Sequence, residues 1–102
     1  MTAYPQPVAR SRIEKRLKDV GRRLSSLRTD LAVAEEAVIQ VEGEADDARL
    51  RALVSETPLA EREHQEVRRQ AEVQRRNRDA LRDEIAKLEL RQDDLLDQYN
   101  QS

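Results

Sequence analysis

The sequence predicts an all-α fold, an antiparallel two-helix coiled-coil hairpin, and three observations carry the prediction. Apolar residues recur at alternating spacings of three and four along most of the chain, which is typical of a coiled coil. Helix breakers are scarce, with two Gly and three Pro among 102 residues. The dipeptide Thr57-Pro58 interrupts the pattern near the middle, so that a reversal there leaves two arms of similar length.

The composition favours one elongated helical domain over a compact globule, because 39% of the residues are charged and 37% hydrophobic. The net charge of −2 is unevenly spread: +6 over residues 1–29, −8 over 30–66 and zero over 67–102. Such patterning favours pairing between segments of the chain. Arg outnumbers Lys by sixteen to three, which we interpret as the codon bias of a GC-rich bacterial genome.

The sequence also bears on the compartment. The absence of Cys excludes a disulfide framework and a Cys-based zinc site, and is compatible with a reducing cytoplasm. The first residues, MTAYPQPVARS, lack the apolar core of a signal peptide, and no stretch approaches the ~18 apolar residues of a membrane span. We therefore expect a soluble, cytoplasmic protein with no membrane contact.

The first helix is predicted over residues 12–54, after a flexible tail at 1–10. Ser11 and Glu14 have the spacing of a capping box that would start it. Gly43 does not end it, because the apolar spacing continues in phase beyond it. The predicted seam consists of Ile13, Leu17, Val20, Leu24, Leu27, Leu31, Ala34, Val38, Val41, Ala45, Ala48 and Ala52.

The turn is predicted at residues 55–57 and the second helix at 58–99, which makes 11–99 one hairpin domain before a frayed end at 100–102. Thr57 suits the N-cap and Pro58 the first turn of that helix. The second seam consists of Ala60, His64, Val67, Ala71, Gln74, Arg78, Leu81, Ile85, Leu88, Gln92, Leu95 and Tyr99.

An antiparallel register follows from the two seams, in which Leu24 faces Leu88 and Leu31 faces Leu81. Charged residues beside the seams agree with it, since most of them meet an opposite charge across the interface. Ion pairs predicted in this way include Arg23–Glu84, Arg28–Glu89, Glu42–Arg75, Arg49–Glu61 and Arg51–Glu63.

Polar seam residues could mark a ligand or proton site, or could fix the register of the two arms. We favour register control, with the Arg78 side chain reaching out toward Glu35. His64 is the only His and has no second strong ligand beside it, so no metal site is predicted. A two-helix hairpin also offers no pocket for catalysis, and we expect no enzyme activity, catalytic residue, cofactor or small-molecule substrate.

A basic run near the N-terminus could contact the phosphates of DNA or RNA. No aromatic residue interleaves it, and the facing C-terminal segment is acidic, so internal pairing of this charge is the favoured interpretation and nucleic acid is not the expected partner. The run consists of Arg10, Arg12, Lys15, Arg16, Lys18, Arg22 and Arg23.

The stretch EGEADDARL at residues 42–50 resembles the glycine–acid–acid tip of the Gre-type factors, whose coiled-coil hairpin enters the secondary channel of bacterial RNA polymerase. The resemblance implies a similar hairpin shape. In that family the acids lie at the tip and hold a metal, whereas the register here places them three to four helical turns before the turn. The family's second globular domain is also missing, so no catalytic residue is transferred.

Four large apolar residues lie within two helical turns of the reversal and face away from the seam: Leu50, Leu53, Val54 and Leu59. We call them the turn cluster and predict that they bind a protein partner, either another protein or a second copy. The predicted function is a non-enzymatic coiled-coil interaction module or adaptor that binds through its tip and outer faces. The alternatives are an RNA polymerase accessory factor that uses the hairpin as a probe and a small nucleic-acid-binding protein that uses the basic run.

Overall fold

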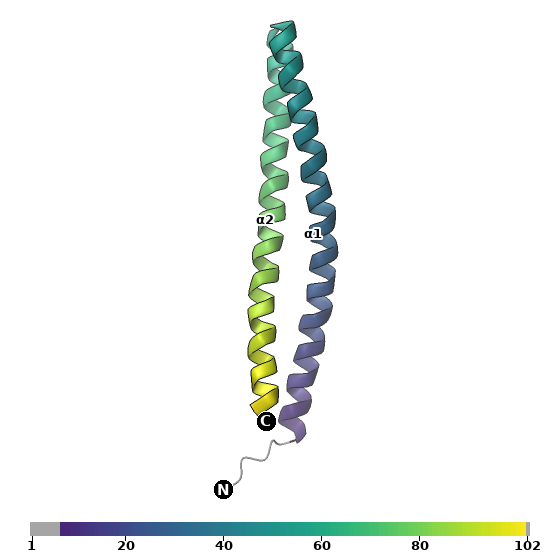
Figure 1. Ribbon diagram of the computed structural model, residues 1–102, viewed down its shortest axis with the longest axis vertical. Helices are drawn as coiled ribbons and strands as arrows, with labels where there is room; N and C mark the ends of the chain where they lie inside the picture. Colours follow the sequence, from purple (N-terminus) through teal and green to yellow (C-terminus); the bar gives the residue numbers. More distant parts are fainter. Residues whose placement is uncertain (1–6, 102) are drawn as a thin grey trace. The chain divides into compact units, whose positions relative to one another are not determined.

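The chain forms an antiparallel two-helix coiled-coil hairpin in a computed structural model that describes residues 7–101 (Figure 1). Helix α1 spans Pro7–Ser55 and helix α2 spans Pro58–Gln101, and the described residues contain no strand. The two helices pack against each other, which confirms the predicted fold class.

Both helices extend past their predicted outer ends. Helix α1 begins at Pro7, so Ser11 and Glu14 lie inside it and the proposed capping box does not start it. A proline at the first helical position loses no hydrogen bond, and no breaker follows before Ser11. Of the predicted flexible tail, residues 7–10 are therefore helical, and residues 1–6 lie outside the described part. At the other end α2 continues to Gln101 instead of stopping at 99.

The reversal of the chain consists of Glu56 and Thr57. Glu56 adopts a left-handed backbone conformation with φ of 51°, and its N–H donates to the carbonyl oxygen of Ala52 at 3.1 Å. Thr57 caps α2, because its Oγ1 accepts a hydrogen bond from the N–H of Ala60 at 3.2 Å. The Thr57 carbonyl oxygen accepts the N–H of Glu61 at 3.1 Å, which closes the first turn of α2.

Gly43 is an ordinary, exposed position within α1. No atom lies within 4 Å of the place where a Cβ would stand. No close contact therefore requires a glycine at position 43, and the phase of the seam continues through it as predicted.

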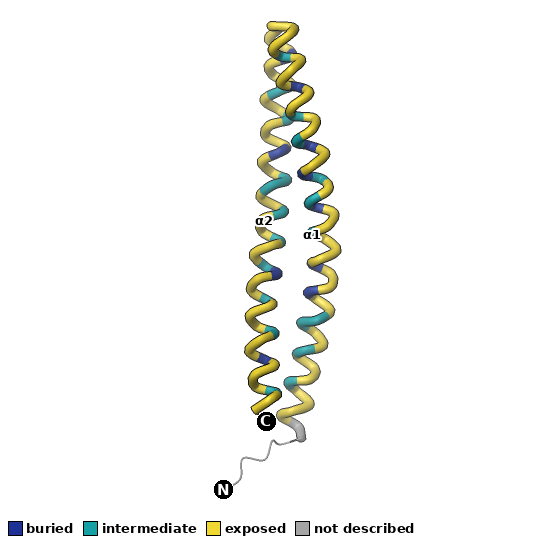
Figure 2. The backbone as a smooth tube through the Cα atoms, viewed as in Figure 1, coloured by how far each residue is buried: buried dark blue, intermediate teal, exposed yellow. Residues whose placement is uncertain are grey.

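The chain divides into two compact units. The terminal unit comprises the described residues of Met1–Thr29 and Arg82–Ser102, and the turn unit comprises Asp30–Leu81. In each unit the buried residues lie on the sides of α1 and α2 that face each other, and the outward sides are exposed (Figure 2). Every residue of the two predicted seams is buried or half-buried.

The core of the terminal unit is built from large side chains. Leu24, Leu27 and Leu95 are the largest fully buried side chains of the described chain, and Ile85 is buried with them. Two of the predicted ion pairs flank this core: Arg23 to Glu84 at 2.7 Å and Arg28 to Glu89 at 3.7 Å. Since these pairs are half exposed, each adds only about 0.2–1 kcal/mol, and burial of the Leu side chains dominates the stability.

The core of the turn unit is built from small side chains. Its buried residues are Ala34, Val38, Val41, Ala48, Ala60 and Ala71. One predicted ion pair forms beside them, from Arg75 Nε to Glu42 Oε1 at 2.9 Å. Because Ala buries much less apolar surface than Leu, this unit is stabilised less per layer than the terminal unit.

Three expectations for the polar side chains of the turn unit are wrong. Arg78 Nε donates to Oδ1 of its neighbour Asp79 at 3.0 Å and does not reach Glu35. Arg49 and Arg51 make no ion pair with any described residue, so their predicted pairs with Glu61 and Glu63 do not form. Long exposed side chains choose among partners that differ by less than about 1 kcal/mol, and a register alone does not decide the choice.

Candidate protein-binding surface

The turn cluster is exposed to solvent, with 53–85% of the surface of its four residues accessible. Leu50, Leu53 and Val54 belong to the last turns of α1, and Leu59 belongs to the first turn of α2. Their positions follow from helical spacing, because the seam residues Ala48, Ala52 and Ala60 take the sides that face the other helix.

The seam next to the turn cluster does not bury the four large side chains of the cluster. Ala48 and Ala60 are buried and Ala52 is half-buried, and such small side chains bring the helices close together. The larger apolar side chains nearby are thus left outside. An exposed apolar cluster of this kind is typical of a contact surface.

Further large apolar residues are exposed on the outward sides of the helices. Val33 and Ile39 lie on α1, whereas Val73, Leu90 and Leu96 lie on α2. The sequence predicts the exposure of the first four, since none of them occupies a seam position. Leu96 was missed, although its place directly after the seam residue Leu95 is the signal that would have identified it.

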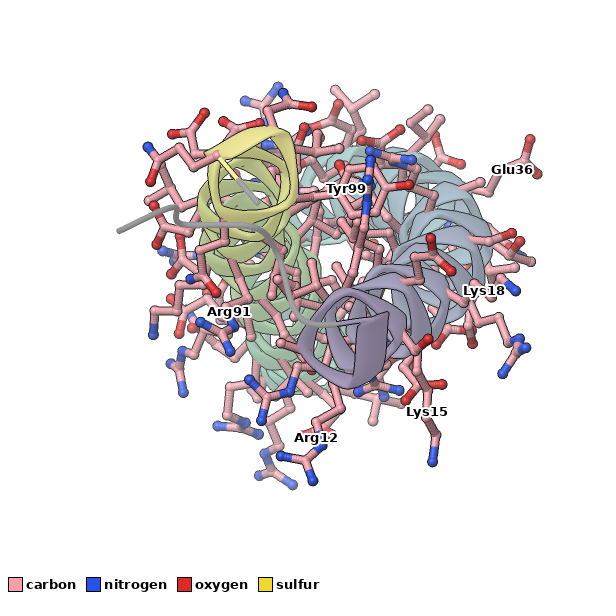
Figure 3. The ribbon with its side chains drawn as sticks, turned by 90° about the horizontal axis from the view of Figure 1, so that it is seen from below. Arg12, Lys15, Lys18, Glu36, Arg91 and Tyr99 are labelled. Atoms are coloured by element: carbon pink, nitrogen blue, oxygen red, sulfur yellow. The ribbon has the colours of Figure 1, made fainter. Side chains whose placement is uncertain are left out.

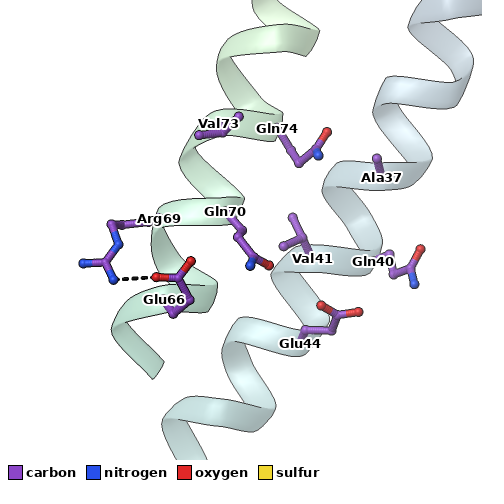
Figure 4. A pocket seen from close by; sticks show the side chains of 9 residues that line it. All are labelled: Ala37, Gln40, Val41, Glu44, Glu66, Arg69, Gln70, Val73 and Gln74. Carbon is purple, nitrogen blue, oxygen red and sulfur yellow. Dashed lines mark hydrogen bonds and ion pairs between the residues drawn. The ribbon is translucent and has the colours of Figure 1, made fainter. Parts of the chain in front are cut away.

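A groove of about 470 Å³, which the sequence does not predict, runs between the helices of the turn unit (Figure 4). Its apolar lining comes from Ala37, Val41 and Val73, and three Gln side chains, Gln40, Gln70 and Gln74, add neutral amides. Ala37, next to the seam, contributes a small side chain to this lining.

One end of this groove carries an ion pair between Arg69 and Glu66, with Nη2 and Oε2 2.5 Å apart. The hydrogen bond from Arg69, followed by its positive charge, holds the pKa of Glu66 below the usual value of a glutamate. Glu66 is therefore a poor candidate for a general acid near neutral pH. The groove can accept an apolar or amide-bearing chain, but these side chains supply no nucleophile paired with a base.

The acids of the EGEADDARL stretch lie along α1. Glu44, Asp46 and Asp47 are exposed residues of the helix, away from the turn. His64 is half-buried, with its Nδ1 3.8 Å from Oε1 of Glu61. Over residues 7–101 no three His, Asp or Glu side chains come together in a way that could hold a metal ion.

The basic run is only partly neutralised by ion pairs. Arg22 pairs with Asp19 of its own helix at 3.3 Å, and Arg23 pairs with Glu84. Arg10 lies over the ring of Tyr99, 4.4 Å from its centroid, and the Tyr99 hydroxyl donates to Glu14 at 3.1 Å.

The remaining members of the run make no ion pair with a described residue: Arg12, Lys15, Arg16 and Lys18. Figure 3 shows Arg12, Lys15 and Lys18 extending from α1 into solvent. The expectation that most of this charge is neutralised within the chain is thus wrong. An exposed ion pair contributes only about 0.2–1 kcal/mol, so solvation of these long side chains competes with pairing across the seam.

The fold defines the class of the protein, an antiparallel coiled-coil hairpin with apolar residues on its outer surface. No protein-family model, curated protein or solved structure matches the chain. Neither helix, over its described length, contains an apolar stretch long enough to cross a membrane.

Proposed function

We propose that the chain is a non-enzymatic interaction module of the cytoplasm and that a protein partner binds its turn cluster. The observation that carries the proposal is the exposure of four large apolar side chains within two turns of the reversal. Single exposed Leu residues are ordinary on soluble proteins, but a group at one place is less so.

Burial of the turn cluster would contribute favourable free energy to binding. Full burial of a Leu or Val side chain contributes about 1.5–3 kcal/mol. Scaled by the exposed fractions of the four residues, the turn cluster offers on the order of 5 kcal/mol before the costs of association are subtracted. Binding would also cover a part of the hairpin whose own core consists of Ala and Val.

The charge around the cluster indicates the chemistry of the partner. Residues 44–63 contain six Asp or Glu and three Arg, so the surroundings of the cluster are acidic. The partner that fits best is a protein surface with an apolar centre and a basic rim. A helix of a larger assembly that lies across the ends of α1 and α2 has this form.

The test compares a double substitution in the cluster with a matched pair elsewhere. Leu50→Glu with Leu53→Glu should abolish capture of the partner from the native host, while helix content and thermal melting stay nearly unchanged. Leu90→Glu with Leu96→Glu places the same charges on exposed positions of α2 and should leave capture intact. A photo-crosslinking residue at position 53 should label the captured protein, and one at position 90 should not.

Two results would contradict the proposal. Loss of helix content in the Leu50→Glu, Leu53→Glu variant would mean that the cluster belongs to the core. Unchanged capture by a folded variant would mean that the contact lies elsewhere.

A further inference from the structure

The groove beside Ala37 continues into a second hollow of the turn unit. This hollow, of about 340 Å³, shares Ala37 and Gln74 with the first and extends it away from the turn, to Asp30 on α1 and Leu81 on α2. We call the two hollows together the long groove. All of its lining residues belong to the turn unit, so the long groove is one continuous surface of that unit.

The middle of the long groove is lined by apolar and neutral side chains. Val33 of α1 is 67% exposed and Val73 of α2 is 58% exposed, and Ala37 is half-buried. Gln70 and Gln74 project from α2 toward α1 (Figure 4). Because an amide both donates and accepts hydrogen bonds, this lining suits an apolar stripe that carries a few polar side chains.

The two sides of the seam differ in charge at this level of the turn unit. Ala37 directly precedes a seam residue and Glu42 directly follows one, so they lie on opposite sides of the seam. On the Glu42 side, Arg75 reaches across from α2 at 2.9 Å. On the Ala37 side, the short side chains of Ala37 and Val73 form no such bridge. A third helix can therefore approach α1 and α2 together on the Ala37 side.

The two ends of the long groove are acidic. Asp30 lines one end and Glu44 lines the other, and neither makes an ion pair with another described residue. The one cation among these lining residues, Arg69, is held by Glu66 at 2.5 Å. Asp30 and Glu44 are fourteen residues apart on α1, which is about 21 Å at ~1.5 Å per residue. Each end therefore favours a positive charge on whatever binds between them.

We propose that the long groove binds an amphipathic helix of another protein, with a Lys or Arg at each end of its apolar stripe. The stripe packs between Val33 and Val73, and the basic residues lie near Asp30 and Glu44. About four turns of the bound helix are in contact with the turn unit. A helix of this length covers less surface than a stable protein–protein interface, so we expect a dissociation constant on the order of 10–100 μM.

A second copy of this chain does not fit the long groove. If two grooves met with the hairpins antiparallel, Asp30 of each copy would lie against Glu44 of the other. If they met with the hairpins parallel, Glu44 of each copy would lie at the level of Glu66 of the other. Both arrangements bring like charges together, which is repulsive.

A synthetic helical peptide of about 18 residues tests the charges at the two ends. Its apolar stripe consists of Leu and Ala at spacings of three and four, with a Lys at each end of the stripe, fourteen residues apart like Asp30 and Glu44. A matched peptide carries Glu in place of both Lys. In fluorescence anisotropy with the full chain, the Lys peptide should bind about tenfold or more tightly than the Glu peptide. Asp30→Lys with Glu44→Lys should reverse this preference, because both ends of the groove then carry positive charge.

Two results of the peptide experiment would overturn the proposal. One is that the Lys peptide fails to bind the unmodified chain up to millimolar concentration. The other is that the folded Asp30→Lys, Glu44→Lys variant keeps the preference for the Lys peptide.

Substitutions in the lining test the place of binding. Val73→Ser should weaken binding of the Lys peptide about five- to tenfold, whereas Leu90→Ser, a matched exposed position of α2 outside the groove, should leave it unchanged. Ala37→Gln puts a longer side chain into the hollow and should weaken binding about tenfold or more. If circular dichroism shows that Ala37→Gln loses helix content, the comparison of Val73→Ser with Leu90→Ser decides. Equal binding by the Val73→Ser and Leu90→Ser variants would overturn the assignment to the groove.

The long groove and the turn cluster can fail independently. Leu50→Glu with Leu53→Glu should abolish capture of the partner at the turn cluster and should leave binding of the Lys peptide within about twofold. Val73→Ser should have the opposite pair of effects. Loss of peptide binding in the folded Leu50→Glu, Leu53→Glu variant would place the peptide on the turn cluster, which contradicts the groove and leaves the proposed function standing.

Discussion

Leu95 provides the sharpest test of how the hairpin is stabilised. Its side chain is 0% exposed, whereas Leu90, five residues earlier in α2, is 68% exposed. Leu95→Ala removes three carbon atoms from a fully buried site, which costs about 2.4 kcal/mol in transfer free energy at ~0.8 kcal/mol per group. Because a two-helix interface can partly close or hydrate the gap, we expect a total near the low end of the known range, about 2.5–3.5 kcal/mol.

The measurement is urea unfolding followed by circular dichroism, with Leu90→Ala as the control. The control removes the same atoms from the same helix and should change the free energy of unfolding by less than about 0.5 kcal/mol. Equal losses in the two variants would refute the assignment of Leu95 to the seam. Such a result would also place the α2 register in error, since Leu95 and Leu90 lie on different sides of the helix.

Three further predictions concern the backbone and the basic run. Gly43→Ala should raise the free energy of unfolding by about 0.5–1 kcal/mol in the same urea assay, because the site is helical and a methyl group meets no atom there. A lower free energy of unfolding would mean that the helix is distorted at Gly43. Thr57→Ala should lower the free energy of unfolding by about 1 kcal/mol, because it removes the cap on the N–H of Ala60. Thr57→Ser keeps a hydroxyl group and should retain most of that free energy. Equal stability of all three chains would show that the cap contributes nothing. Binding of a DNA or RNA oligonucleotide, followed by fluorescence anisotropy, should be weak and disappear as salt is raised to physiological strength, because no aromatic residue interleaves the basic run and its contacts would be purely electrostatic. Sub-micromolar binding that persists at physiological salt would make the basic run a nucleic-acid site.

The seam could be predicted from the sequence because burial imposes a strict spacing. Moving a buried Leu by one position would expose it and cost about 1.5–3 kcal/mol of burial free energy. Leu24, Leu27 and Leu95 therefore determine which side of each helix faces the other. The reversal was equally well determined, since Thr57 and Pro58 both favour the start of a helix.

The features that were missed involve small energy differences. Helix α1 starts at Pro7 and not at Ser11, and competing helix starts of this kind differ by only about 1 kcal/mol. Arg78 and Arg49 lie on or near the surface, where several partners are nearly equivalent. The groove beside Ala37 was missed for another reason, because a hollow depends on the sizes of neighbouring side chains on both helices.

The unequal cores of the two units have a consequence for the order in which the hairpin forms. Closing the chain near Glu56 and Thr57 costs little conformational entropy, because few residues separate the first contacts. These early contacts involve Ala48, Ala52 and Ala60, whose burial contributes little free energy. A folding nucleus at the turn alone therefore unfolds again. Burial of Leu24, Leu27, Ile85 and Leu95 contributes most of the stabilising free energy. These residues come into contact only after most of both helices has formed. Folding is therefore expected to be cooperative across the chain, with a late barrier, in spite of the short connection that would otherwise allow the helices to zip up one layer at a time.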